Sequence, residues 1–493
     1  MSAIQISNLT FSYDTSFDYI FEHVSFQIDT DWKLGLTGRN GRGKTTFLNL
    51  LMGKYEYQGS IQSNMKFDYF PFQADDPSLM TLDILETMNP QYELWKIIKE
   101  LSMLDISDEV LYRPFESLSN GEQTKVLLAA LFSKENRFLL IDEPTNHLDA
   151  GARRKAAEYL KSKRGFILVS HDRMFLDECT DHILSINKTN IEVQRGNFSS
   201  WYENKMLNDR FEMAENQKLK KEIGRLTDTQ KRTAGWSCEA EKTKRGTRNS
   251  GLRPDRGFIG HKAAKMMKRS KASEMRKEEA VREKSKLLKN IESVDTLKLA
   301  PLVHHAKRLA EFKDTAVFYG DRAAAEHLNF TVEQGDRISL SGPNGCGKSS
   351  VLKLLTGEEI SYTGSLYIAK GLKISYVPQN TAGLKGDLKD YAWQYGIDES
   401  LFKTILRKLD FSRNQFEKRM EEFSEGQKKK VLIARSLCEK AHLYIWDEPL
   451  NFIDVFSRIQ IEELLLKSRP TLLFVEHDRA FGDKIKTKEV KMR

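Results

Sequence analysis

The stretch GRNGRGKTT occupies residues 38–46, and a near copy, GPNGCGKSS, occupies residues 342–350. Both fit the spacing GxxxxGK[ST], a glycine-rich loop whose backbone N–H groups wrap a phosphate at the start of a helix. Each copy follows a short apolar strand, KLGLTG or RISLSG. Two such matches at one repeat offset indicate a duplicated phosphate-binding domain rather than coincidence.

Further blocks repeat at nearly the same offset, between 304 and 306 residues. They are FLLIDEPTNHLD and LYIWDEPLNFID, LSNGE and FSEGQ, SHDR and EHDR, and the glutamines Gln73 and Gln379. Each copy alternates short apolar strands with helical segments, which predicts an α/β fold with a mainly parallel sheet. We therefore expect tandem α/β domains at residues 1–198 and 301–493, joined by a linker at 199–300.

The linker has a different texture. WYENKMLNDRFEMAENQKLKKEIGRL and AAKMMKRSKASEMRKEEAVREKSKLLKNIESV are long, charged helical stretches on either side of a stretch rich in Gly, Arg and Lys. In the second, apolar residues step by three, four and seven, which is typical of a two-helix coiled coil. We expect an antiparallel helical hairpin of about 33 residues per helix, roughly 50 Å long. Its irregular tip is expected at about residues 235–261.

Charge is concentrated in this linker. The chain carries a net +8, but residues 203–300 hold 26 Lys/Arg against 15 Asp/Glu, so the remainder is −3. Between residues 225 and 271 the ratio is 14 to 4. A basic insert in a mildly acidic body indicates a polyanionic partner, with nucleic acid the leading candidate. The alternative is a solvated spacer between domains, which does not require such a patch.

The composition excludes several classes of protein. Charged residues make up 30% of the chain, hydrophobic residues 40%, and the mean hydropathy is −0.53. No stretch approaches the roughly 18 apolar residues of a membrane-spanning helix, and no secretory signal is visible. Cys179, Cys238, Cys346 and Cys438 lie too far apart for a disulfide framework or an iron–sulfur cluster pair. A reduced, cytoplasmic protein is expected.

Both glycine loops carry the residues that bind a nucleoside triphosphate. Lys44 and Lys348 would contact the β- and γ-phosphates, and the following hydroxyls of Thr45 and Ser349 would contact Mg²⁺. This chemistry predicts two sites for a nucleoside triphosphate with Mg²⁺.

An Asp-Glu pair ends a buried strand in each copy. Asp142 and Asp447 would hold Mg²⁺, whereas Glu143 and Glu448 can orient or deprotonate the attacking water. A helix-capping role would be the simpler interpretation of one isolated pair. Both pairs follow a phosphate loop at matching distance, which favours catalysis.

In both copies, a further apolar strand is followed by His-Asp-Arg. The histidines of this sequence, His171 and His477, can each hydrogen-bond a γ-phosphate. Gln73 and Gln379 occupy matching loops, and the repeat supports a role for them at the nucleotide.

In these residues the chain resembles the ATP-binding cassette superfamily. The glycine loops resemble its Walker A motif, LLIDEP and LYIWDEP its Walker B motif, and LSNGEQ and FSEGQK its signature. Leu148–Asp149 and Ile453–Asp454 resemble the D-loop, and the two histidines the switch histidine. Tyr13 and Tyr319 match the aromatic residue that stacks on adenine, with Phe11 and Phe318 as alternatives.

The resemblance implies a head-to-tail sandwich of the two domains, with an ATP at each of two interface sites. Site A would combine Lys44, Asp142, Glu143 and His171 with Ser424 and Gly426, and site B would combine Lys348, Asp447, Glu448 and His477 with Ser119 and Gly121. The ATP-binding residues would be Tyr13, Gly38, Asn40, Gly41, Gly43, Lys44, Thr45, Thr46, Gln73, Ser119, Gly121, Glu122, Tyr319, Gly342, Asn344, Gly345, Gly347, Lys348, Ser349, Ser350, Gln379, Ser424, Gly426 and Gln427. The Mg²⁺ set would be Thr45, Gln73, Asp142, Ser349, Gln379 and Asp447. Asn120 and Glu425 replace the first glycine of the usual signature, which leaves the relative hydrolysis rates of the two sites open.

Tandem cassettes leave three classes: an ABC-F factor on the ribosome, the ATPase subunit of a membrane transporter, and a DNA-maintenance ATPase. The whole chain resembles the ABC-F class, through EPTNHLD, GNFSSWYENK and the basic hairpin between the cassettes. A housekeeping translation factor is the alternative within that class. EPLNFID, FVEHD and the tip are similar to the Lsa- and Vga-type antibiotic-resistance proteins, Lsa most of all.

That similarity implies a monomeric, ribosome-associated ATPase of the cytoplasm. It would bind the ribosomal exit site against 23S rRNA and P-site tRNA, and dislodge lincosamides, pleuromutilins and streptogramin A. The basic tip residues would meet phosphates, and its two aromatic residues would either stack on a base or pack the end of the hairpin. The tip candidates are Trp236, Lys242, Lys244, Arg245, Arg248, Arg253, Arg256, Phe258 and Lys262.

Overall fold

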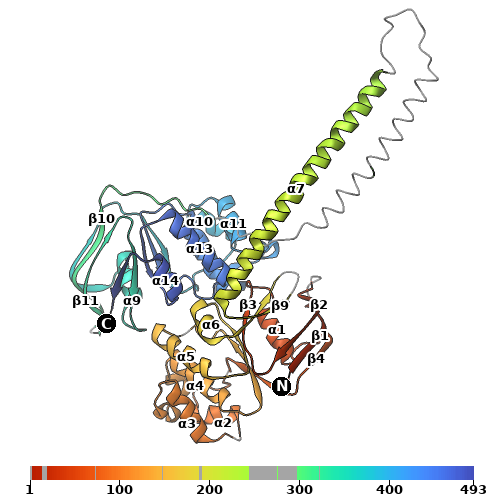
Figure 1. Cartoon of the computed structure of the whole chain (residues 1–493). Coiled ribbons are helices and arrows are strands. Elements are labelled where there is room, and N and C mark those ends of the chain that lie inside the picture. Colours follow the sequence, from red (N-terminus) through yellow and green to blue (C-terminus); the bar gives the residue numbers. More distant parts are fainter. Residues whose placement is uncertain are drawn as a thin grey trace, which may run out of the picture. The chain divides into compact units, whose positions relative to one another are not determined.

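The computed structural model describes residues 3–13, 19–72, 74–90, 92–146, 148–187, 191–243, 275, 297–320 and 322–492, with only the backbone of 226–243 (Figure 1). Two compact units emerge from the contacts: Met1–Trp201 with Val294–Arg493, and Tyr202–Ser293. The first unit contains two α/β repeats. We call the described residues up to Trp201 the first repeat, and those from Leu297 onward the second repeat.

The first repeat contains a six-stranded sheet of order β5-β6-β7-β3-β8-β9. Its strands are parallel except β9, which pairs antiparallel with β8. A second, three-stranded antiparallel sheet has the order β2-β1-β4. The bounds are β1 Ala3–Phe11, β2 Phe21–Asp29, β3 Lys33–Thr37, β4 Gln58–Gln62, β5 Lys66–Phe70, β6 Arg137–Asp142, β7 Phe166–Val169, β8 His182–Ile186 and β9 Ile191–Arg195. The parallel sheet confirms the expected α/β fold.

Helices connect the parallel strands, as right-handed crossovers between such strands require. They are α1 Lys44–Leu51, α2 Thr81–Met88, α3 Leu94–Met103, α4 Asn120–Phe132, α5 Ala150–Ser162 and α6 Arg173–Cys179, with short 3₁₀ turns η1 Asp108–Tyr112 and η2 Phe115–Ser117. Buried apolar side chains of both sheets and α1 form one core. Strand β7 is buried along its whole length, as expected of a central parallel strand.

The second repeat has the same plan. A five-stranded parallel sheet has the order β14-β15-β16-β12-β17, and a three-stranded antiparallel sheet has the order β11-β10-β13. The strands are β10 Arg308–Tyr319, β11 Arg322–Glu333, β12 Arg337–Ser341, β13 Ser361–Ile368, β14 Ile374–Val377, β15 Leu443–Asp447, β16 Leu472–Val475 and β17 Lys488–Lys491. The helices are α9 Lys348–Leu355, α10 Leu388–Gln394, α11 Glu399–Lys408, α12 Glu425–Cys438, α13 Val455–Ser468 and α14 Arg479–Ile485, with η3 Arg413–Glu417 and η4 Met420–Glu422.

Helix α7, Phe198–Thr243, leads out of the first repeat and is 46 residues long. At 1.5 Å per residue it extends about 69 Å. It exceeds the roughly 33 residues we expected because neither of its two internal glycines, Gly224 and Gly235, ends it. It also continues into the segment 235–261 that we expected to be irregular. The partner helix of the expected coiled coil lies outside the described residues, apart from Met275.

Within the described part of the chain, no helix has both the length and the apolar character that are needed to cross a bilayer.

A buried ion pair joins the two repeats. Arg173 on α6 donates to both carboxylate oxygens of Glu462 on α13, and both side chains are less than a tenth exposed. Lys484 lies 3.4 Å from the same carboxylate. The repeat has no second copy of this pair: the matching residues are Arg479 and Ala157, and Arg479 donates instead to the carbonyl of Ala150.

Replacing Glu462 by Gln should lower the free energy of unfolding by about 3 kcal/mol, because the buried guanidinium of Arg173 loses its counter-charge. Urea unfolding of the variant and the wild type provides the measurement. Glu158→Gln, in the exposed pair with Arg154 on α5, is the control and should have little effect. An unchanged urea midpoint for Glu462→Gln would contradict the assigned importance of the pair.

Candidate nucleotide-binding sites

Each phosphate loop connects a central strand to a helix, β3 to α1 and β12 to α9. Gly43 and Gly347 cap these helices in the left-handed region, with φ of 90° and 81°. A Cβ on Gly43 would lie 2.5 Å from a methyl group of Ile20, and one on Gly347 would lie 2.3 Å from the Ala324 carbonyl oxygen. Glycine is therefore required at both positions by conformation and by space.

The loop lysines lie in equivalent positions. Lys44 Nζ donates to the carbonyls of Gly38 at 2.8 Å and Arg39 at 3.2 Å, and Lys348 Nζ donates to those of Gly342 at 2.9 Å and Pro343 at 2.8 Å. Both ammonium groups thus curl over their own loop. That is the position from which a lysine reaches phosphates bound in the loop.

The strand-end aspartates fit a divalent cation. Asp142 accepts hydrogen bonds from Thr45 and Tyr69, both at 3.0 Å, so the loop hydroxyl and the carboxylate already meet. Asp447 is buried, yet neither of its carboxylate oxygens has a hydrogen-bond partner among the described residues. Burial raises the pKa of both groups, that of Asp447 to about 6. Buried oxygens without partners beside a hydroxyl-bearing loop suit Mg²⁺.

The glutamate after each aspartate faces the switch histidine. Glu143 and Glu448 have φ of 50° and 46°, in the left-handed region where non-glycine residues are uncommon. The closest nitrogen–oxygen distances are 3.4 Å for His171 to Glu143 and 3.3 Å for His477 to Glu448. Each histidine and glutamate are therefore assembled in one place, as the resemblance implied.

The two glutamates differ in their electrostatics. Burial and the neighbouring Asp142 carboxylate raise the pKa of Glu143 to about 8. Burial also acts on Glu448, but the hydrogen bond and charge of His477 outweigh it and lower the pKa to about 2. Asn451 also donates to Glu448 at 2.6 Å. The two glutamates are thus electrostatically unequal.

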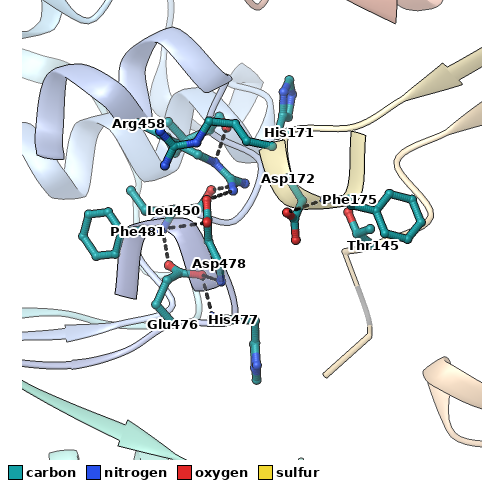
Figure 2. A network of polar contacts seen from close by, with 12 residues as sticks. Thr145, His171, Asp172, Phe175, Leu450, Arg458, Glu476, His477, Asp478 and Phe481 are labelled. Carbon is teal, nitrogen blue, oxygen red and sulfur yellow. Dashed lines mark hydrogen bonds and ion pairs between the residues drawn. The ribbon is translucent and has the colours of Figure 1, made fainter. Parts of the chain in front are cut away.

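Near the candidate catalytic residues, the two repeats differ at a pair of positions that the sequence patterns did not indicate. In the first repeat, the hydroxyls of Thr145 and Ser170 lie 3.2 Å apart, and the hydroxyl of Ser170 accepts from the Asp172 backbone at 3.1 Å. In the second repeat the matching residues are Leu450 and Glu476. The Glu476 carboxylate accepts from the Leu450 backbone at 3.1 Å (Figure 2). Because Leu450 lacks the hydroxyl of Thr145, the longer side chain of Glu476 makes the link between these two positions by accepting from the backbone instead.

The two repeats also differ on helix α12, where Lys429 stands at the position of Thr124 in the first repeat. The ammonium of Lys429 is buried and donates to the backbone carbonyls of Pro378 and Glu448, both at 3.1 Å. The charge of Lys429 thus lies beside the carboxylates of the second repeat. Comparison of LSNGEQTK with FSEGQKKK shows the substitution, but not its burial.

Two matching arginines, Arg153 and Arg458, were also missed. Arg458 donates at 2.9 Å to three groups: the carbonyls of Ile453 and Leu450, and the carboxylate of Asp478, which follows the switch histidine (Figure 2). Arg153 makes two equivalent contacts, to Leu148 at 2.9 Å and Asp172 at 3.1 Å. Each arginine therefore ties a D-loop to a switch loop. The identical offset in the repeat was the available signal.

Site B encloses a cavity of about 1110 Å³ between the two repeats. Phosphate-loop residues of the second repeat and signature residues of the first both line it. Among the expected residues, the cavity brings together Ser119, Gly121, Glu122, Tyr319, Asn344, Gly345, Gly347, Lys348, Ser349, Ser350, Gln379, Glu448 and His477.

Site A is closed by direct contacts. Asn40 of the first phosphate loop donates to the Phe452 carbonyl at 3.1 Å. A Cβ on Gly426 would lie 2.4 Å from that same oxygen and 3.2 Å from the Asn40 amide nitrogen. The signature glycine of the second repeat therefore lies against the phosphate loop of the first. Ser424 accepts from the Gln427 backbone, just as Ser119 does from Glu122, so both serines cap their helices.

The remaining expected residues lie as follows. Tyr13 and Tyr319 are exposed, and Tyr13 also hydrogen-bonds Thr46 at 2.9 Å. Phe11 is buried, whereas Phe318 is half-buried. The residues outside the described part are Gln73, Lys244, Arg245, Arg248, Arg253, Arg256, Phe258 and Lys262, and only the backbone of Trp236 and Lys242 is described. Among the described residues, no cluster of three or more His, Cys, Asp or Glu could hold a metal ion.

Comparison with known proteins agrees with this geometry. A family model described as ABC transporter matches residues 21–146 and 325–451. The chain is 28% identical over 484 residues to the ribosome protection protein VmlR of Bacillus subtilis, covering 96% of this chain and 84% of VmlR. It is 27% identical over 514 residues to the ATP-binding protein Uup of Buchnera aphidicola, covering 98% and 79%.

Among solved structures, an archaeal ribosome recycling factor, crystallised with a ribosomal stalk protein, matches with a TM-score of 0.63 at 20% identity. The match covers 98% of this chain and 87% of that protein. At this identity the likeness shows the fold alone, two tandem cassettes.

Replacing Arg458 by Lys should lower kcat for ATP hydrolysis about tenfold with little change in KM, because the charge beside Asp478 remains while the fork to Leu450 and Ile453 is lost. Steady-state phosphate release measures both constants. Arg154→Lys, on the exposed face of α5, is the control. Equal kcat in the two variants would show that the link between the loops is not needed for hydrolysis.

Proposed function

Because the chain belongs to the ATP-binding cassette family, with two cassettes of the ABC-F type, we propose that it is an ATP-dependent ribosome-protection factor. Its ABC ATPase domains imply ATP hydrolysis. The observation that carries the proposal is the alignment with VmlR, which spans 96% of this chain and therefore includes the basic linker as well as the cassettes.

The ATP sites supply the conformational work in this proposal. Lys44 and Lys348 bind the phosphates, and Asp142 with Thr45, or Asp447 with Ser349, would hold Mg²⁺. That ion, when bound, neutralises charge on the phosphate oxygens. Glu143 and Glu448 orient and deprotonate water, and the switch histidines support them across 3.4 and 3.3 Å.

ATP binding then selects the closed state of the cassettes, which is the state that docks. The linker, with 26 basic against 15 acidic residues between 203 and 300, binds rRNA and tRNA phosphates in the ribosomal exit site. Its tip displaces lincosamides, pleuromutilins and streptogramin A from the peptidyl-transferase centre. Hydrolysis reopens the cassettes and releases the factor.

A housekeeping ABC-F translation factor is the second candidate. Its support is the similar identity, 27%, to the ATP-binding protein Uup of Buchnera aphidicola, whose name refers only to ATP binding. Such a factor would bind ribosomes in the same nucleotide-dependent way without relieving drug inhibition. A transporter ATPase subunit, to which the family description alone points, would bind no ribosomes at all.

The double variant Glu143→Gln, Glu448→Gln should bind ATP, hydrolyse it at least about a hundredfold more slowly, and remain on ribosomes, because reopening requires hydrolysis. Co-sedimentation with 70S ribosomes, with and without ATP, is the measurement. Lys44→Ala with Lys348→Ala is the matched control and should not be retained. Release of the glutamine variant at the wild-type rate would contradict the proposed role of hydrolysis in release. Absence of binding with or without ATP would contradict the proposal that the protein binds ribosomes.

A further inference from the structure

The first turn of α7 is fixed to the helix that follows the switch histidine of site A. The backbone N–H of Ser199 donates to Asp177 on α6 at 2.7 Å, and the Ser199 hydroxyl donates to the other carboxylate oxygen at 2.5 Å. Directly before α7, the Asn197 side chain accepts from the Ser200 backbone at 3.1 Å, as an N-cap does. Any movement of α6 therefore moves the start of α7.

An aromatic contact joins the same turn to the second repeat. Phe198 and Trp201 are buried, with ring centroids 5.3 Å apart. Trp201 also meets the ring of Phe456 edge-on, at a centroid distance of 6.2 Å and an interplanar angle of 70°. Phe456 is the second residue of α13 and stands two positions after the D-loop aspartate, Asp454. The start of α7 is thus in contact with the second repeat's D-loop helix.

Phe456 also contacts the phosphate loop of site A. The Arg39 guanidinium carbon lies 5.8 Å from the Phe456 ring centroid, within cation–π range. Arg39 also lies 3.8 Å from the Asp410 carboxylate of the second repeat. Arg39 directly precedes Asn40, which donates to the Phe452 carbonyl. One ring therefore contacts both the phosphate loop of site A and the base of the linker helix.

At the matching positions, site B lacks both side chains of this arrangement. The residue matching Arg39 in the repeat is Pro343, and the residue matching Phe456 is Gly151. A proline and a glycine offer neither a cation nor an aromatic ring. The internal duplication thus acts as its own control, since the contact exists on the site that adjoins α7 and its counterpart is missing on the other.

We propose that Phe456 is a positioning residue that couples nucleotide at site A, rather than at site B, to the base of linker helix α7. ATP in the first phosphate loop orders Arg39 and draws the D-loop helix toward it. Phe456 then shifts against Trp201, while α6 holds the same turn through Ser199. The inference rests on the proposed function, because the coupled movement is what would make the linker competent to dock.

The test uses the full-length protein without ribosomes, so that it is independent of the docking proposal. Spin labels placed by non-cysteine chemistry at the exposed positions Leu207 on α7 and Trp393 on α10 report the distance between helix and second repeat. The parent carries Glu143→Gln and Glu448→Gln so that ATP stays bound. ATP should shift its distance distribution. Phe456→Leu, which keeps an apolar side chain for folding, should reduce the shifted population about fivefold or more.

Leu466→Ala, an exposed position on the same helix, is the matched control and should behave like the parent. Lys44→Ala should abolish the shift more completely than Lys348→Ala. Binding of a fluorescent ATP analogue should stay within about twofold of the parent in Phe456→Leu, because a coupling residue does not alter the site itself.

Any of three results of the distance measurement would overturn the inference: no ATP-dependent shift in the parent, a full shift in Phe456→Leu, or a shift that survives Lys44→Ala but not Lys348→Ala. Loss of ATP binding in Phe456→Leu would also overturn it, because the residue would then belong to the site. If the shift behaves as expected and ribosome binding fails, the inference stands and the proposed function falls.

Discussion

The backbone of the phosphate loop constrains everything else in each repeat. At Gly43 and Gly347 the chain must turn through the left-handed region while lying against Ile20 or Ala324, where a Cβ would clash. Only glycine meets both requirements. The turn directs the first helical residues, a lysine and a hydroxyl, toward the strand-end aspartate, so that Thr45 and Asp142 meet at 3.0 Å. The positions of Glu143 and His171 then depend on β6 and its neighbour β7, which end beside that contact.

The fold and most of the site could be predicted from the sequence because both rest on local patterns. Glycine spacing, apolar runs of strand length and a constant offset identified the sheets, the phosphate loops and the residues of the two sites. Gly224 shows where local reasoning was weak: a glycine costs a helix only about 1 kcal/mol, and α7 continues through it to Thr243. Propensity alone does not reveal how far such a helix extends.

Contacts between residues distant in sequence could not be predicted. Glu462 lies 289 residues from Arg173, and nothing in either helix indicates the pairing. Likewise, Lys429 looks like one lysine in a basic run, KKK, until the fold buries it beside Glu448. These features arise from the second repeat's divergence. They make the two ATP sites unequal in charge, in closure and in their connection to α7, even though their motifs match.

The relief of drug inhibition that we propose for this ATPase can be measured in a cell-free translation assay. Purified protein is added to ribosomes inhibited by a lincosamide, a pleuromutilin, a streptogramin A or a macrolide, beside a variant whose residues 244–261 are replaced by a short glycine loop. We expect the protein to restore translation with the first three drugs, whereas the variant should not. Failure to restore translation with any drug, by a protein that still binds ribosomes with ATP, would contradict ribosome protection.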